Sequence, residues 1–211
     1  MNDRSEPQWL LWARELQAVA QIGLHFTRDP YDRGRYEQIR SLAARMMAAQ
    51  SGHDFAPIRE LFAEQTGYAT PKVDVRGAVV QDGKILLVRE LSDGGKWTLP
   101  GGWAEINQSP AESAVREVRE ETGFEVKITK LAAVYDRGKY PHRPVYPFHI
   151  YKFFFLCEIT GGSPAASLET EMPTFFAEDE IPALSEDRVL PFQIQRMFAH
   201  AREPDLPCEC D

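Results

Sequence analysis

Three glutamates, Glu117, Glu120 and Glu121, stand close together near the middle of the chain. On a helix, positions i, i+3 and i+4 are neighbours, so the three carboxylates share one acidic patch and repel one another. A divalent cation turns this repulsion into attraction, and magnesium is usually held by a few carboxylates together with substrate phosphates. Arg116 lies one turn before Glu120 and can hold that carboxylate by an i, i+4 ion pair. The pattern indicates a metal-binding cluster or, alternatively, an ordinary solvated acidic face.

Sequence signals mark both ends of the helix that carries the acidic patch. Ser109 and Glu112 form a capping box around Pro110 at the first helical position, and Gly123 can take the left-handed conformation that ends a helix. Before the helix lies a glycine-rich loop, Leu99-Pro100-Gly101-Gly102, where the backbone can approach another group closely. This loop favours the metal-binding interpretation over a solvated face.

One short set of residues at fixed spacings resembles the signature of the Nudix hydrolases: Gly102, Arg116-Glu117-Val118, Glu120-Glu121 and Gly123-Phe124. The resemblance implies metal-dependent hydrolysis of the pyrophosphate bond of a nucleoside diphosphate linked to another group. It implies that the three glutamates are catalytic and bind Mg²⁺, with Mn²⁺ as an alternative, and that Arg116 orients them. Gln108 departs from the pattern, which usually has a glutamate there, and its uncharged oxygen leaves the number of metal ions open.

The predicted substrate site reaches beyond the acidic patch. Gly101 and Gly102 allow a diphosphate to approach the backbone, and Glu105 matches a position of the family that is often acidic. Glu169 and Glu171 lie where some relatives place a further catalytic carboxylate. The general base is therefore expected to be a glutamate of the acidic patch or one of these two residues.

Three cationic side chains are further candidates for the substrate site. Arg137 and Lys139 lie in a basic, proline-rich loop over residues 136–144 and can bind a diphosphate through charge-assisted hydrogen bonds. The alternative for this loop is an ordinary solvated segment. Arg76 stands in an apolar strand, where an arginine needs a partner. It either faces the substrate or pairs with Asp74 or another carboxylate.

The composition of the 211-residue chain indicates which kinds of molecule the protein can bind. A net charge of −8 argues against a protein that holds nucleic acid by broad electrostatic attraction, although it allows a nucleotide substrate. Because no apolar run of signal-peptide or membrane-spanning type is present, a cytoplasmic location without a membrane partner is expected. The rival interpretation is a non-catalytic nucleotide-sensing or RNA-binding protein on the same fold, which has no need of the acidic patch.

The order of the predicted elements gives the fold class. Apolar periodicity predicts helices over residues 9–26 and 35–49, and a third from Asp54 to Gly67. The pattern then changes to strands around the acidic helix, over residues 73–80, 84–88, 97–99, 128–135 and 148–159, with a last helix over 190–201. This order predicts an α/β protein with helices packed against a mixed sheet.

The Nudix resemblance makes this prediction more specific. It implies a mixed-sheet α/β/α sandwich over residues 71–203, preceded by a small all-helical N-terminal domain over residues 1–70. Together with residues 97–104 and 148–152, the helical front piece is similar to a bacterial subgroup associated with hydrolysis of CDP-choline or ADP-ribose. The same route implies a homodimer with the amphipathic N-terminal helices at its interface. Residues 204–211 are predicted to form a tail that frays around Cys208-Glu209-Cys210.

Overall fold

The computed structural model describes residues 6–168 and 170–211. Glu169, one candidate for the general base, lies outside the described residues. The chain forms two compact units, of which the first takes in the chain up to Pro71 together with two short segments, Gly138–Pro141 and Tyr146–His149. The second takes in Lys72–Arg137, His142–Val145 and Ile150–Asp211. Among the helices of the described ranges, none is long and apolar enough to cross a membrane.

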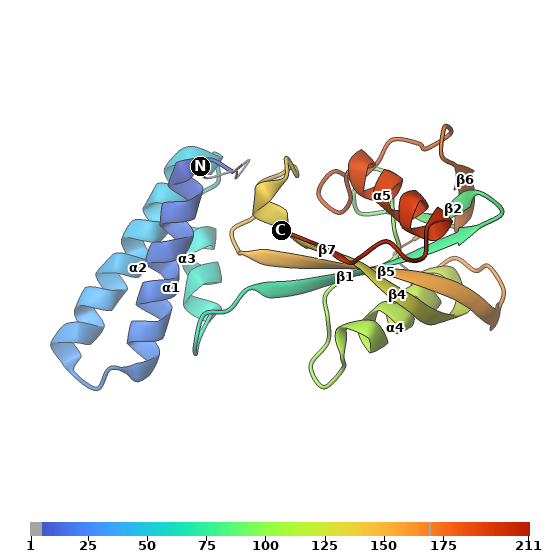
Figure 1. The fold of residues 1–211 in the computed structure, drawn as a ribbon. Coiled ribbons are helices and arrows are strands. Elements are labelled where there is room, and N and C mark those ends of the chain that lie inside the picture. Colours follow the sequence, from blue (N-terminus) through green and yellow to red (C-terminus); the bar gives the residue numbers. More distant parts are fainter. Residues whose placement is uncertain (1–5, 169) are drawn as a thin grey trace. The chain divides into compact units, whose positions relative to one another are not determined.

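The first unit is helical (Figure 1), with α1 (Gln8–Phe26), α2 (Pro30–Ser51) and α3 (Phe55–Glu64). Helices α1 and α2 pack closely, since a Cβ added to Gly23 of α1 would lie 2.3 Å from the Tyr36 ring of α2. Helix α2 begins well before the predicted start at residue 35. The reason is local, because the Asp29 side chain caps two backbone N–H groups and Pro30 opens the first turn.

The second unit is a mixed sheet with the strand order β3-β2-β1-β5-β4-β7, and β6 pairs with β2. The strands are β1 (Lys72–Gln81), β2 (Lys84–Arg89), β3 (Trp97–Thr98), β4 (Phe124–Asp136), β5 (Ile150–Gly162), β6 (Thr174–Ala177) and β7 (Glu209–Cys210). Figure 1 shows α4 (Pro110–Thr122) and α5 (Pro191–Arg202) on opposite sides of this sheet. The predicted fold class, an α/β/α sandwich preceded by helices, is confirmed.

Packing against β1 fixes the helix that carries the acidic patch. A Cβ added to Gly77 of β1 would lie 2.3 Å from a methyl carbon of Val118, so the absent side chain lets α4 approach the sheet. Val75, Ala114 and Phe155 are buried in the same apolar cluster. The candidate site residues of α4 therefore lie on a helix that packs tightly against the core of the sheet.

Two predictions about strands need correction. Strand β4 begins at Phe124 rather than at residue 128, because Gly123, with φ of 75°, turns the chain directly from α4 into the strand. The predicted fraying of the tail is wrong, since Glu209 and Cys210 form β7 beside β4. The Glu209 carboxylate accepts hydrogen bonds from the Tyr135 hydroxyl at 2.5 Å and from Arg196 Nε at 2.6 Å, which anchors the tail.

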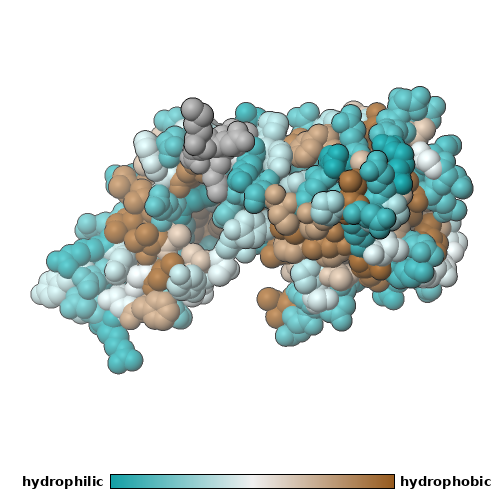
Figure 2. Space-filling view, viewed as in Figure 1, coloured by the Kyte–Doolittle hydropathy of each residue, from teal (hydrophilic) through white to brown (hydrophobic). Residues whose placement is uncertain are grey.

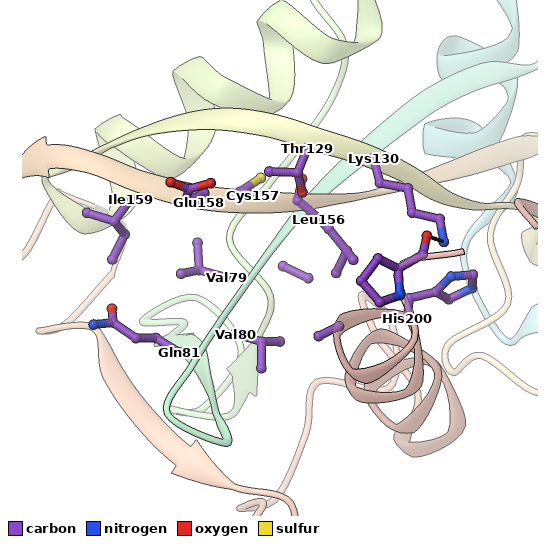
Figure 3. A pocket seen from close by; sticks show the side chains of 13 residues that line it. Val79, Val80, Gln81, Thr129, Lys130, Leu156, Cys157, Glu158, Ile159 and His200 are labelled. Carbon is purple, nitrogen blue, oxygen red and sulfur yellow. Dashed lines mark hydrogen bonds between the residues drawn. The ribbon is translucent and has the colours of Figure 1, made fainter. Parts of the chain in front are cut away.

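A cavity of about 690 Å³ opens at the C-terminal end of α5 (Figure 3). Its walls include Val80 and Leu156 from the sheet, and His200 and Pro204 from the end of α5 and the segment after it. Helix α4 lies on the other side of β5 in this view. Among residues 6–168 and 170–211, no residue of the predicted site lines this cavity, so the acidic patch is a separate feature.

Candidate active site

Helix α4 presents two of its glutamates to the glycine-rich loop. The Gly101 N–H donates a hydrogen bond to Glu121 Oε2 at 3.0 Å. The Glu117 carboxylate lies beside Gly102, where an added Cβ would stand 3.1 Å from Oε1. The structure thus brings together the loop and two of the three predicted carboxylates.

Strand β1 holds the glycine-rich loop in place. The Val75 N–H donates to the Gly102 carbonyl at 2.8 Å, and the Gly77 N–H donates to the Pro100 carbonyl at 2.9 Å. Gly101 between them has φ of 144°, and an added Cβ would lie only 2.0 Å from the Val75 carbonyl oxygen. Only glycine fits this position, because the backbone conformation and the close approach both exclude a side chain.

Arg116 links the remaining polar groups of the acidic patch. Its Nη1 donates to Glu120 at 2.7 Å, which is the predicted i, i+4 pair, and its Nη2 donates to Glu117 at 2.8 Å. Its Nε donates to Gln108 Oε1 at 3.2 Å, so Gln108 holds the arginine in this arrangement. The Glu120 side chain is half exposed, in contrast to the more buried Glu117 and Glu121.

The charged form of the two less exposed carboxylates, Glu117 and Glu121, is unfavourable in the free protein. Burial raises the pKa of Glu121 to about 8; Arg76 and the Gly101 N–H oppose this rise, whereas the neighbouring charges of Glu117 and Glu90 add to it. Burial also raises the pKa of Glu117, against the effect of Arg116. A cation placed here would favour the charged form of both groups.

The chemistry of the donor set fits a hard divalent cation. Carboxylate oxygens are ligands that Mg²⁺ takes, and the raised pKa values show that the protein alone disfavours the charged form of Glu117 and Glu121. Within residues 6–168 and 170–211, however, no three side chains of His, Cys, Asp or Glu already surround a metal-sized space. Arg116 holds Glu117 and Glu120 in this state, so a cation would compete with the guanidinium for these carboxylates.

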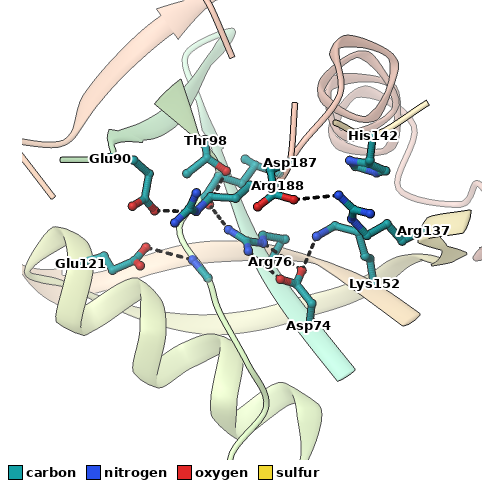
Figure 4. A network of polar contacts seen from close by, with 12 residues as sticks. Asp74, Arg76, Glu90, Thr98, Glu121, Arg137, His142, Lys152, Asp187 and Arg188 are labelled. Atoms are coloured by element: carbon teal, nitrogen blue, oxygen red, sulfur yellow. Dashed lines mark hydrogen bonds and ion pairs between the residues drawn. The ribbon is translucent and has the colours of Figure 1, made fainter. Parts of the chain in front are cut away.

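Two residues near the patch were not predicted from the sequence. Glu90 follows β2, is 5% exposed and lies close enough to Glu121 and Arg76 to affect the pKa of each. Arg188, in the loop before α5, donates from Nε to Glu90 at 3.1 Å. Figure 4 shows these four side chains converging. The position of Glu90 directly after an apolar strand could have marked it as a candidate site residue. Nothing in the sequence indicated that it pairs with Arg188.

Arg76 and Arg137 are buried rather than open to a substrate. Arg76 forms two hydrogen bonds with Asp74, at 2.9 and 2.6 Å, which is one of the two alternatives that the sequence left open. Arg137 donates to Asp187 at 2.7 Å and to the Pro144 carbonyl at 2.7 Å, so it is neither solvated nor directed at a diphosphate. Because both side chains are buried in contacts with other protein groups, this geometry favours a role in holding the site together over direct contact with a substrate.

The other predicted residues lie in more open positions. The Glu105 side chain is exposed, and its backbone N–H donates to the hydroxyl of Ser113 on α4 at 3.2 Å. Lys139 ends the short 3-10 helix η1 (Arg137–Lys139) and is half-buried within the first unit. Glu171, a candidate for the general base, is half exposed and pairs with Arg89 at 3.0 Å.

His142 is buried in the same polar region (Figure 4) but cannot act as an acid near neutral pH. Burial lowers its pKa to about 3, and the neighbouring charges of Lys152 and Arg137 add to this effect. The ring is therefore neutral, with Nδ1 at 2.8 Å from the Glu186 carbonyl. Its contacts are those of a structural histidine.

Comparison with known proteins identifies two segments. Residues 71–194 match the NUDIX domain, and residues 7–62 match a segment described as a UDP-X-like N-terminal oligomerisation domain. The chain is similar to the putative ADP-ribose pyrophosphatase YjhB of Bacillus subtilis (strain 168), at 45% identity over 200 residues that cover 95% of each protein.

Two solved structures support the same assignment. A UDP-X diphosphatase is 35% identical, with a TM-score of 0.62 over 96% of this chain and 98% of that chain. An ADP-ribose pyrophosphatase from Streptococcus suis is 34% identical, with a TM-score of 0.61 over 67% of this chain and 100% of that chain. Because the NUDIX match takes in the whole acidic patch and its glycine-rich loop, the chain belongs to the Nudix hydrolases and is a pyrophosphohydrolase of that family.

Proposed function

We propose that the protein hydrolyses the pyrophosphate bond of a nucleoside diphosphate linked to a second group, with ADP-ribose and CDP-choline as the first candidates. The observation that carries this proposal is the buried Glu121 carboxylate on the Gly101 N–H, with Glu117 beside Gly102. The similarity to a protein named as a putative ADP-ribose pyrophosphatase supports the first candidate. The second follows from the subgroup that the helical front piece resembles.

Each part of the site has a task in this reaction. Mg²⁺, or Mn²⁺ in its place, would be held by Glu117 and Glu121 with Glu120, and would supply a Lewis acid for the diphosphate oxygens and lower the pKa of the attacking water. Gly101 and Gly102 remain proposed substrate contacts through their backbone, since the space that their side chains would fill is taken by the Val75 carbonyl and the Glu117 carboxylate. Arg116 orients two of the carboxylates.

Water forms the new P–O bond as the bridging P–O bond breaks, which gives two phosphorylated products. A carboxylate of the acidic patch accepts the proton of the water, once the bound cation has favoured the charged form of these glutamates. Glu171 is the weaker candidate for this role, since Arg89 already pairs with it. Glu105 remains a proposed substrate contact, as does Lys139.

A substrate panel tests the proposal directly. The purified chain is incubated with Mg²⁺ and ADP-ribose, CDP-choline, dinucleotides or nucleoside triphosphates, and the products are separated by chromatography. We expect AMP with ribose 5-phosphate, or CMP with phosphocholine. Tight nucleotide binding without turnover of any compound would instead support the non-catalytic alternative.

Binding of Mg²⁺ is expected to release a proton near neutral pH. Glu121 has a pKa of about 8 in the free protein and is therefore mostly protonated at pH 7, whereas a bound cation requires the carboxylate. Calorimetric titrations at pH 7 in two buffers of different ionisation enthalpy measure this release. It should approach one proton per cation at pH 7 and fall towards zero above pH 9, because Glu121 is then already charged.

The matched variants for this titration are Glu121→Gln and Glu125→Gln. The first removes the buried carboxylate and should abolish the proton release, whereas the second changes an exposed strand residue and should leave it unaltered. Binding to the wild-type protein at pH 7 without any proton release would contradict the assignment of Glu121.

A homodimer through the first unit is a second part of the proposal. Trp12, Val19 and Phe26 recur every seven residues on α1, so they share one face of the helix, and each is at least half exposed. Apolar surface is visible over the helices of this unit in Figure 2. A second copy of the chain is the expected partner of this stripe, in line with the match to an oligomerisation domain.

Replacing Val19 by aspartate should convert the dimer to a monomer, because the interface would bury an unpaired charge. Light scattering after gel filtration measures the mass, which should fall from twice 24.0 kDa to 24.0 kDa. Ala56→Asp, at an exposed position on α3, is the control and should remain dimeric. A wild-type monomer, or a dimer that persists in Val19→Asp, would contradict the proposal.

We retain two further parts of the proposal. The chain is divided into a helical domain over residues 1–70, a Nudix domain over 71–203 and a tail over 204–211. A cytoplasmic location also remains a proposal.

A further inference from the structure

We infer that Asp74, Arg76 and Lys152, called here the ionic triad, position the glycine-rich loop and through it the Glu121 carboxylate. The inference rests on the proposed function and deepens it. The triad lies within the second unit, with Arg76 on the side nearer to Glu121 (Figure 4). Its members are positioning residues, because none of them is open to a substrate.

The triad is a closed set of charge-assisted contacts. Arg76 donates from Nε and Nη2 to the two Asp74 oxygens, and Lys152 Nζ donates to Asp74 Oδ1 at 2.7 Å. The side chains of Arg76 and Lys152 are 4% and 2% exposed. Burial opposes ionisation of Asp74, yet the two adjacent cations hold its pKa down at about 2, so the carboxylate stays charged.

One contact connects the triad to the glycine-rich loop. The third donor of Arg76, Nη1, lies 3.2 Å from the Leu99 carbonyl oxygen. Two residues later, the Gly101 N–H donates to Glu121. The guanidinium can serve Asp74 and Leu99 together because its donors form a rigid fork, which a lysine ammonium does not reproduce. A shift of Arg76 would therefore move the loop against the carboxylate that it binds.

The charges of the triad point to a role besides stability. Buried ion pairs are often replaced by apolar side chains of similar volume without loss of stability, so stability alone does not require them. The triad holds two cations and one anion, and its surplus positive charge faces Glu121 and Glu90, which lie close to Arg76. The triad thus supplies the hydrogen bond from Arg76 to the Leu99 carbonyl and a positive charge that favours the charged form of Glu121.

The test separates positioning from stability by two variants. The first replaces the whole triad by apolar side chains, Asp74→Leu with Arg76→Met and Lys152→Met. The second, Arg76→Lys, keeps the charge but loses the fork. Lys127→Met, at an exposed ion pair between β4 and β5, is the control for removal of a cation. For each protein we measure kcat, KM, the thermal midpoint and the exchange rate of the Gly101 amide proton by NMR.

We expect the triple variant to fold with a midpoint near that of the wild type but to lose about 100-fold in kcat, with little change in KM. Arg76→Lys should lose about tenfold in kcat, and Gly101 should exchange faster in both variants. Either variant, folded and with wild-type kcat and Gly101 exchange, would overturn the inference. If the triple variant does not fold, Arg76→Lys decides alone. An inactive wild type would refute the proposed function, while Gly101 exchange would still report on the triad.

Discussion

Glu121→Gln is expected to lower kcat by about 10²–10⁴-fold, the range over which general acid–base groups contribute, and to leave the fold intact. Glutamine has nearly the same shape, and its side-chain oxygen can still accept the Gly101 N–H at the position that Glu121 Oε2 occupies. It cannot carry the negative charge that a cation or a proton from water requires. Turnover of the preferred substrate and the circular dichroism spectrum measure the two effects.

The same variant should change how stability depends on pH. The pKa of Glu121 is raised in the folded protein from 4.5 to about 8, so its contribution to stability is fully present below pH 4.5 and is lost as the pH rises through 8. Glutamine has no such titration. Between pH 5 and pH 9 the free energy of unfolding should therefore fall less for the variant, which should be the more stable protein at pH 9.

The exposed carboxylate of Glu125 provides the control for both measurements. Glu125→Gln makes the same chemical change shortly after α4 and should preserve wild-type turnover and the wild-type dependence of stability on pH. Full turnover by Glu121→Gln would refute the catalytic assignment. A pH dependence of stability equal to that of the wild type would instead refute the buried, protonated state of the carboxylate.

Local signals predicted the acidic helix because its determinants are neighbours in the chain. Ser109 Oγ accepts from the Glu112 N–H at 3.2 Å, and the Glu112 carboxylate accepts from the Ser109 N–H at 2.7 Å, as the capping box requires. Gly123 ends the helix with φ of 75°. Each of these contacts joins residues within one helical turn, so the sequence alone is sufficient to anticipate them.

Long-range pairs could not be anticipated in the same way. Asp74 meets Lys152 because the parallel register of β1 and β5 places them opposite each other, and the register depends on packing of the whole sheet. The pairing of Glu90 with Arg188 likewise depends on how the loop before α5 returns to β2. The ordered C-terminal tail could not be predicted for the same reason, because Glu209 is held by Tyr135 and Arg196, which belong to other elements.

Gly101→Ala is expected to destabilise the protein by about 3 kcal/mol or more, as strained backbone and steric overlap combine. The new Cβ would lie 2.0 Å from the Val75 carbonyl oxygen, which belongs to the backbone of β1 and cannot rotate away. Relief requires the loop to leave the strand, which breaks the hydrogen bond from Val75 N–H to the Gly102 carbonyl. Urea denaturation measures the loss, and activity should disappear with the displaced loop.

Gly102→Ala is the matched comparison, because it adds the same methyl group one residue later. Its Cβ would lie 3.1 Å from the Glu117 carboxylate, which ends a flexible side chain and can shift. We therefore expect near-wild-type stability but reduced kcat, since the shifted carboxylate leaves the position in which Arg116 and the loop hold it. Equal stability of the two alanine variants would contradict this account, because Gly101 faces rigid backbone and Gly102 faces a movable carboxylate side chain.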